Sequence, residues 1–232
     1  HSAISFSQNT DEGYFFGGFE SNSQWLLYDE GLNFDQPDDA FRANNYLQLS
    51  YSYKNFTAGI QQESYLPDAL LGYSNAFTNG NGVATYYVNY KNEKVDVTGG
   101  YFYDQFGSGL VFRSWEERQL GINNAMRGVR VKYNPTNYLD FTALYGQQRI
   151  GFELSSGVLQ GLDGNVDVSK ALGIESIDLK MGASYVGRYQ AVGAQLELPS
   201  NVNVVGGRLD VVKGNFYGGL EVASKSKDAL FF

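Results

Sequence analysis

The chain has no cysteine, and its only histidine is His1. Without cysteine there is no disulfide, no thiolate nucleophile and no zinc site built on sulfur. A Ser-His-Asp triad or a histidine-ligated metal needs histidine inside the fold, and a first residue seldom belongs to an organised site. The sequence therefore predicts a protein that is not an enzyme, with no catalytic residue, no cofactor site and no metal site.

Charge is also scarce, since charged residues make up 18% of the 232 residues and the formal net charge is −8. A nucleic-acid partner would want a basic face, so none is expected. No run of eighteen apolar residues occurs, which excludes a membrane-spanning helix but leaves a transmembrane barrel open. Tyrosine (18), phenylalanine (16) and glycine (28) are abundant, a mixture that favours strands and tight turns over helices.

Alternation of apolar and polar residues is the main structural signal, and it is clearest from Val95 to Asp104, where every second residue is apolar, aromatic or glycine. The same period predicts about eleven strands, over residues 14–28, 45–53, 56–63, 83–90, 95–104, 127–133, 138–148, 176–185, 188–198, 202–212 and 216–223. Residues 149–175 are interrupted by glycines, and we expect mostly loop there with one short embedded strand. Glycine pairs inside strands, such as Gly206-Gly207, predict bends, bulges or close approach of another backbone.

Short turns and long loops alternate through the first two-thirds of the chain, with long loops at 29–42, 64–82 and 106–126. This pattern resembles an outer-membrane β-barrel. The predicted fold is all-β, with antiparallel, hairpin-connected strands in an outer-membrane β-barrel or partial barrel, and residues 1–232 form a single β-barrel-like domain. The strands of a large soluble β-sandwich also alternate. This fold remains an alternative, because several of the predicted strands are polar on both faces.

An odd number of strands conflicts with the even number with which bacterial single-chain barrels close. An unclosed sheet leaves two edges of unpaired backbone groups. Either further strands exist, or the chain continues, or a partner covers an edge.

The loop from Phe106 to Met126 is the least strand-like stretch. Gly107 and Gly109 bracket a turn, and Ser114 stands three residues before Glu117, the spacing of a capping box. We therefore predict a short helical turn from Ser114 to Leu120 inside the loop.

Three residues of this loop, Arg113, Trp115 and Arg118, form the predicted partner contact. Exposing Trp115 with its apolar neighbours would be unusual for a loop, and the two arginines flank it as the polar rim of an aromatic anchor would. The alternative is that Trp115 only plugs the protein's own sheet.

Three segments carry a family resemblance: GGFESNSQWLLYD at 17–29, QQESYLPDALLGYS at 61–74 and YFYDQFGSGLVFRSWEERQLGINNAMRGVRVKYNP at 101–135. Together they resemble an uncharacterised family of exported β-barrel-like outer-membrane proteins from bacteria that use type IX secretion. The likeness covers roughly the first 150 residues. It implies that the chain is the N-terminal part of a longer barrel and lies at the outer membrane, on its periplasmic side.

The resemblance also implies a function. Type IX secretion uses a very large barrel translocon and a subunit that plugs its periplasmic end, and this chain is similar to such a subunit. The implied role is non-enzymatic: an accessory or plug subunit that gates the translocon, with the large translocon barrel and the lipid bilayer as partners. The alternative is an outer-membrane porin-like channel for small solutes, which would need a closed barrel of even strand number with a polar lumen. An outer-membrane lipase or protease ranks third, because the fold lacks an internal histidine.

Overall fold

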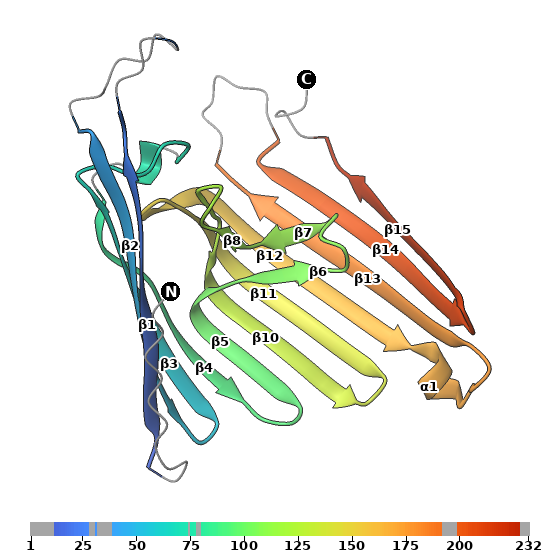
Figure 1. Cartoon of the computed structure of the whole chain (residues 1–232). Helices are drawn as coiled ribbons and strands as arrows, with labels where there is room; N and C mark the ends of the chain where they lie inside the picture. Colours follow the sequence, from blue (N-terminus) through green and yellow to red (C-terminus); the bar gives the residue numbers. More distant parts are fainter. Residues whose placement is uncertain are drawn as a thin grey trace. The chain divides into compact units, whose positions relative to one another are not determined.

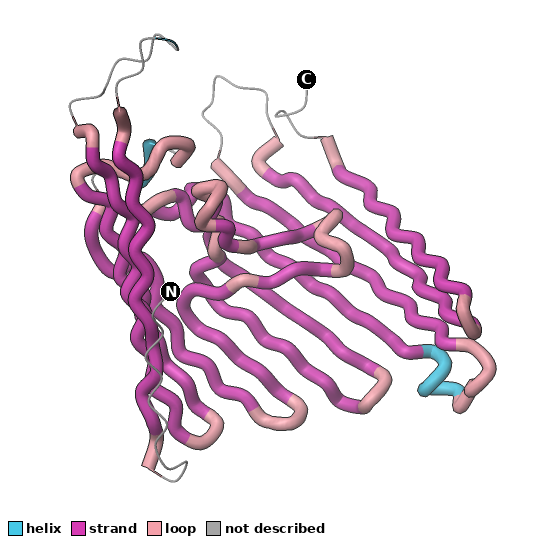
Figure 2. The backbone as a smooth tube through the Cα atoms, viewed as in Figure 1, coloured by secondary structure: helices cyan, strands magenta, loops and turns pink. Residues whose placement is uncertain are grey.

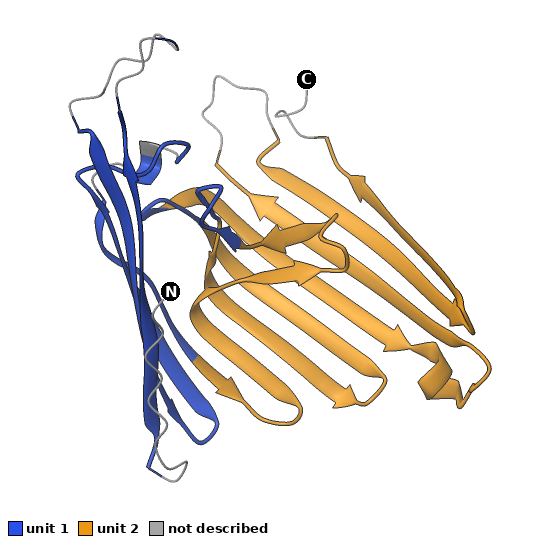
Figure 3. Ribbon diagram, viewed as in Figure 1, with its two compact units in different colours: residues 1–88, 116–123, 149–153 blue, residues 89–115, 124–148, 154–232 orange. Residues whose placement is uncertain are grey.

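A computed structural model describes residues 12–27, 31, 39–73, 75–77, 80–191 and 199–227. The chain divides into two compact units (Figure 3). Unit 1 consists of residues 1–88, 116–123 and 149–153, and unit 2 of residues 89–115, 124–148 and 154–232.

Eleven strands form one hydrogen-bonded sheet whose strand order follows the chain (Figure 1). They are β1 (Tyr14–Trp25), β2 (Phe41–Tyr53), β3 (Phe56–Leu66), β4 (Asn81–Lys91), β5 (Val95–Phe102), β10 (Met126–Thr136), β11 (Leu139–Ile150), β12 (Glu153–Asp167), β13 (Asp178–Tyr189), β14 (Asn201–Lys213) and β15 (Phe216–Lys225). The predicted all-β fold with antiparallel, hairpin-connected strands is confirmed. As far as the described residues go, the sheet does not close into a barrel, since β1 and β15 each have one neighbour in the strand order, and it fits a partial barrel.

The smaller elements lie in the connections. β6 (Asp104–Phe106) pairs with β7 (Phe112–Ser114), and β8 (Glu116–Glu117) pairs with β9 (Ile122–Asn123). The 3-10 turn η2 (Asn75–Phe77) follows β3, and the single α-helical turn α1 (Val168–Leu172) follows β12. In the described part of the chain, no helix is both long and apolar enough to cross a membrane.

The helical turn predicted from Ser114 to Leu120 is wrong, because this stretch forms β7 and β8 and the turn after them. The Ser114 hydroxyl donates to the carbonyl of Asn124 at 3.0 Å, so it does not cap a helix. The predicted turn between Gly107 and Gly109 is confirmed. Both glycines have positive φ, and the amide of Gly109 donates to the carbonyl of Phe106 at 2.9 Å.

The prediction of mostly loop over 149–175 is also wrong, because β12 is the longest strand of the sheet. Its glycines mark places where other groups pack closely rather than chain breaks. A Cβ on Gly161 would lie 3.0 Å from side-chain atoms of Leu144 and Phe106. The start of the strand predicted at 188–198 is wrong, because Arg188 and Tyr189 are the last two residues of β13. Residues 192–198 lie outside the described residues. Of the long loop predicted at 29–42, the last two residues open β2, and most of the rest is likewise not described.

Each unit has its own buried apolar cluster. In unit 1, Tyr46 and Tyr65 pack with Ala69, Phe77 and partly buried Tyr73 and Phe152. In unit 2, the cluster consists of Phe102, Phe106, Phe112, Met126, Leu144 and Val186.

Candidate functional site

The two faces of the strands in unit 1 differ sharply in polarity. The antiparallel registers of β1 with β2 and of β2 with β3 place large exposed apolar side chains on one face, which we call the apolar face. They are Phe15, Phe19, Trp25, Phe41, Leu47, Leu49, Tyr51, Tyr53, Phe56, Ile60 and Leu66. The opposite face, the polar face, carries Glu20, Arg42, Gln48, Gln61 and Glu63.

Unit 2 has the same division. Its apolar face carries exposed Val129, Tyr133, Phe141, Tyr145, Leu162, Met181, Val205, Leu209, Leu220 and Val222. Its polar face carries Asp96, Arg130, Lys132, Asp163, Ser184, Arg208 and Glu221. Among the described strand residues with a defined register partner, only Arg127 and Lys213 place a charge on the apolar face, and each lies near a strand end.

An ion pair without any exposed side-chain surface lies on the polar face of unit 1. The Arg149 guanidinium donates to both carboxylate oxygens of Glu63, at 2.9 and 2.5 Å. The Tyr65 hydroxyl and the Gln61 amide donate to the same carboxylate at 2.6 and 2.7 Å. The Nε of Arg149 donates to the carbonyl of Gly151. Each carboxylate oxygen of Glu63 therefore receives two donors, so this carboxylate is fully hydrogen-bonded despite its burial.

Arg118 is held against the same face of unit 1. It forms ion pairs with Glu20 and with Glu116, and its guanidinium lies 4.2 Å from the centre of the Tyr46 ring. Its backbone carbonyl accepts a hydrogen bond from the Tyr73 hydroxyl. Burial disfavours its charged form, but the two carboxylates outweigh this and keep the pKa of Arg118 above its ordinary value.

A hairpin covers the polar face of unit 2. Residues 103–115, which include β6 and β7, fold back over the strands of this unit (Figure 2). Phe106 and Phe112 from the hairpin pack into the cluster formed by Phe102, Leu144 and Val186 of the sheet. At the tip, the amide of Ser108 donates to the Glu221 carboxylate at 2.9 Å.

Glycine permits this close approach. A Cβ on Gly206 would lie 2.5 Å from Cγ2 of Val111 in the hairpin. The sequence predicts a bend, a bulge or close approach of another backbone at the Gly206-Gly207 pair. At Gly206 the nearest group is instead the side chain of Val111.

A charged network lies on the polar face of unit 2 beyond the hairpin. Arg208 donates to both carboxylate oxygens of Asp163, at 2.7 and 2.8 Å, and to the Ser184 hydroxyl at 2.7 Å. It also donates to the side-chain oxygen of Asn165, whose amide reaches Asp140 at 2.7 Å.

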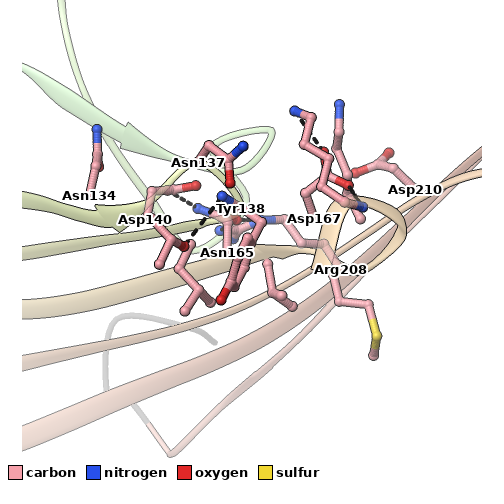
Figure 4. A pocket seen from close by; sticks show the side chains of 14 residues that line it. Asn134, Asn137, Tyr138, Asp140, Asn165, Asp167, Arg208 and Asp210 are labelled. Atoms are coloured by element: carbon pink, nitrogen blue, oxygen red, sulfur yellow. Dashed lines mark hydrogen bonds and ion pairs between the residues drawn. The ribbon is translucent and has the colours of Figure 1, made fainter. Parts of the chain in front are cut away.

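Beside this network lies an open pocket of about 470 Å³ (Figure 4). Its charged lining residues are Asp140, Asp167, Lys170, Lys180, Arg208 and Asp210. The acids and bases balance, and Lys170 pairs with Asp167 at 3.0 Å.

The predicted partner residues fall in different units. The Arg113 guanidinium stacks on the Trp115 ring, 4.2 Å from its centre, and the backbone N–H of Trp115 donates to Asn124 at 2.6 Å. Both residues belong to unit 2, whereas Arg118 binds acidic and aromatic side chains within unit 1. The role of Arg113, Trp115 and Arg118 in binding a partner stays a prediction.

Sequence reasoning missed the paired charges of the polar face. Glu63 and Arg208 lie in strands that the sequence predicts, so alternation was the available signal for the face that each occupies. Asp163 lies in residues 149–175, where the sequence predicts mostly loop, so no such signal existed for it. Arg149 follows the last residue of β11 that has a defined partner in β10, so alternation could not place it. Across the described residues, no group of three or more His, Cys, Asp or Glu side chains could hold a metal ion.

Comparison with known proteins gives a family but no activity. A family model described as a family of unknown function (DUF6029) matches residues 2–232, so the chain belongs to this family. No curated protein sequence matches the chain. The family description states no activity, location or partner.

Proposed function

We propose that this member of a family of unknown function is a non-enzymatic protein of an outer membrane. Its apolar face contacts lipid, and its polar face is directed toward an aqueous interior. The observation that carries this proposal is the near absence of charge on a face crowded with exposed Phe, Tyr, Leu and Val side chains in both units. In water, contiguous apolar surface of this extent is rare on a monomer. In a bilayer, alternation of apolar-out and polar-in residues is what a spanning β-sheet requires.

The covered polar faces favour a plug over an open channel. In unit 2 the hairpin of residues 103–115 packs two phenylalanines onto that face, and in unit 1 Arg118 and its partners lie against it. A wide solute channel would instead leave such charged side chains lining water. We therefore propose an accessory or plug role at a secretion translocon, and the type IX system remains the one that the sequence resemblance implies.

The first test is membrane retention of the protein in its native host. We expect the full-length protein to remain in the outer-membrane fraction after extraction with alkaline carbonate, because the large apolar side chains of this face are exposed. Release of folded protein into the aqueous extract would show that the apolar face does not contact lipid, and it would contradict the proposal.

The second test separates the plug from the porin-like channel. Purified protein reconstituted into planar bilayers should give no stable conductance, since the polar face of unit 2 is covered by its own hairpin. Steady single-channel steps from folded protein would instead support the solute channel. A double variant Phe106→Ser, Phe112→Ser removes the apolar anchors of the hairpin, and Leu110→Ser in the exposed turn is the matched control. Conductance that arises only in the double variant would identify the hairpin as the occluding element.

A further inference from the structure

On the apolar face of unit 1, an exposed aromatic pair lies at the strand ends opposite the short turn between β2 and β3. Trp25 pairs across β1 and β2 with Phe41, and their ring centres lie 5.9 Å apart. The side chains of Trp25 and Phe41 are 69% and 45% exposed. Leu66 of β3 lies beside them on the same face and is also exposed.

Uncharged polar residues border these three side chains. Ser23 and Ser64 occupy the next positions on the same face of β1 and β3. On β2 the buried Ala43 follows Phe41 on this face, and Asn45 comes after it, opposite Ser64. The side-chain oxygen of Asn45 accepts from Ser21 at 2.7 Å. Within the described part of the chain, the amide nitrogen of Asn45 and the hydroxyls of Ser23 and Ser64 have no hydrogen-bond partner. We call these six residues, Trp25, Phe41, Leu66, Ser23, Asn45 and Ser64, the rim patch.

The depth of the rim patch places its polar residues where lipid cannot satisfy them. On the same two strands, Phe15 pairs with Tyr51 at the short-turn end, and residues 15 and 25 are separated by about 33 Å of strand. With the strand tilt usual in membrane barrels this spans about 25 Å, the height of the apolar band. Ser23 and Asn45 then fall inside that band, where unpaired polar groups are unfavourable.

Neither water nor lipid therefore suits the rim patch, whereas protein does. Aromatic anchors surrounded by uncharged hydrogen-bonding groups are the composition of a protein interface. In addition, β1 has one hydrogen-bonded neighbour among the described strands, and Glu20 is its single charged residue. Edge strands that face solvent are usually protected by charge or proline.

We infer that the rim patch docks a second, membrane-embedded β-protein that lies alongside β1. That partner offers an apolar recess for Trp25 and uncharged acceptors for Asn45. This inference rests on the proposed membrane location and names where the partner of the plug binds.

The test places a photoreactive benzoylphenylalanine at position 25, at position 41 or at position 15 of the full-length protein in its native host. We expect positions 25 and 41 to give the same adduct, with an outer-membrane β-protein identified by mass spectrometry, and position 15 to give none. Adducts with lipid alone, with a second copy of this chain or with no molecule would each overturn the inference.

Matched substitutions test the same surface by affinity. Trp25→Ser with Phe41→Ser should reduce recovery of that partner at least tenfold while the protein stays in the membrane fraction. Phe15→Ser with Tyr51→Ser alters the equivalent cross-strand pair on the same strands and should leave recovery per retained molecule unchanged. Equal losses in both variants would contradict a docking role for the rim patch. Failure of the membrane proposal is seen separately, as aqueous extraction of the unaltered protein.

Discussion

Arg149→Leu is expected to lower the free energy of unfolding by about 3–5 kcal/mol, because it leaves the Glu63 carboxylate charged, buried and without its cation. Both side chains of the pair have 0% exposure, so water cannot replace the lost donors. Tyr65 and Gln61 would still donate to Glu63, but neither carries a charge. Urea titration of the protein in detergent micelles, followed by tryptophan fluorescence, measures the change.

Two further variants separate the ion pair from the loss of packing. The double variant Glu63→Leu, Arg149→Leu removes both charges and should recover most of the lost stability, since no buried charge remains. Lys180→Leu breaks the pair with Asp178, whose side chains are both about half exposed, and should change stability by about 0–1 kcal/mol. If Arg149→Leu costs no more than Lys180→Leu, the variant does not leave Glu63 as a buried charge without compensation.

Strand existence could be predicted from the sequence because one face of each strand is consistently apolar. The predicted strands at 56–63, 95–104 and 202–212 fall within two or three residues of β3, β5 and β14. The alternation reflects burial or lipid contact of one face, and a pattern of period two records it directly.

The prediction of loop in place of β12 is wrong for a physical reason. Its glycines at 157, 161 and 164 are usually read as breaks, but Gly161 lies under Phe106, and its missing side chain leaves room for the hairpin. Long-range packing of this kind is absent from a local window. The same holds for Ser114. Its spacing from Glu117 suited a capping box, but its hydroxyl donates to the backbone carbonyl of Asn124.

The candidate site was predictable only in its chemistry. The sequence predicts Arg118 as a partner-contact residue beside Trp115. Its contacts Glu20 and Tyr46 come from strands far away along the chain. The pairing of Glu63 with Arg149 joins residues that no spacing rule connects. The pairs of charges on the polar face could therefore be identified only from the structure, whereas the polar face itself could be predicted from the sequence.

Leu162→Arg is the second large effect, and it distinguishes a lipid-facing sheet from a soluble one. Leu162 lies near the middle of the apolar face of unit 2, opposite Tyr185, and is 60% exposed. On a soluble protein an exposed substitution of this kind changes stability by about 0.5 kcal/mol or less. At the centre of a bilayer, arginine on the lipid face of a β-sheet costs about 2–4 kcal/mol.

Phe216→Arg supplies the depth control. Phe216 is 82% exposed on the same face, but it pairs with Lys213 at the end of β14 next to a short turn. There the cost should fall to about 0–1 kcal/mol, because the guanidinium can reach the water boundary. The two variants are compared by urea titration in lipid vesicles and by the amount of each protein assembled in the outer membrane. A large loss for Leu162→Arg with little loss for Phe216→Arg follows only if lipid covers this face, and equal, small effects would show that water covers it.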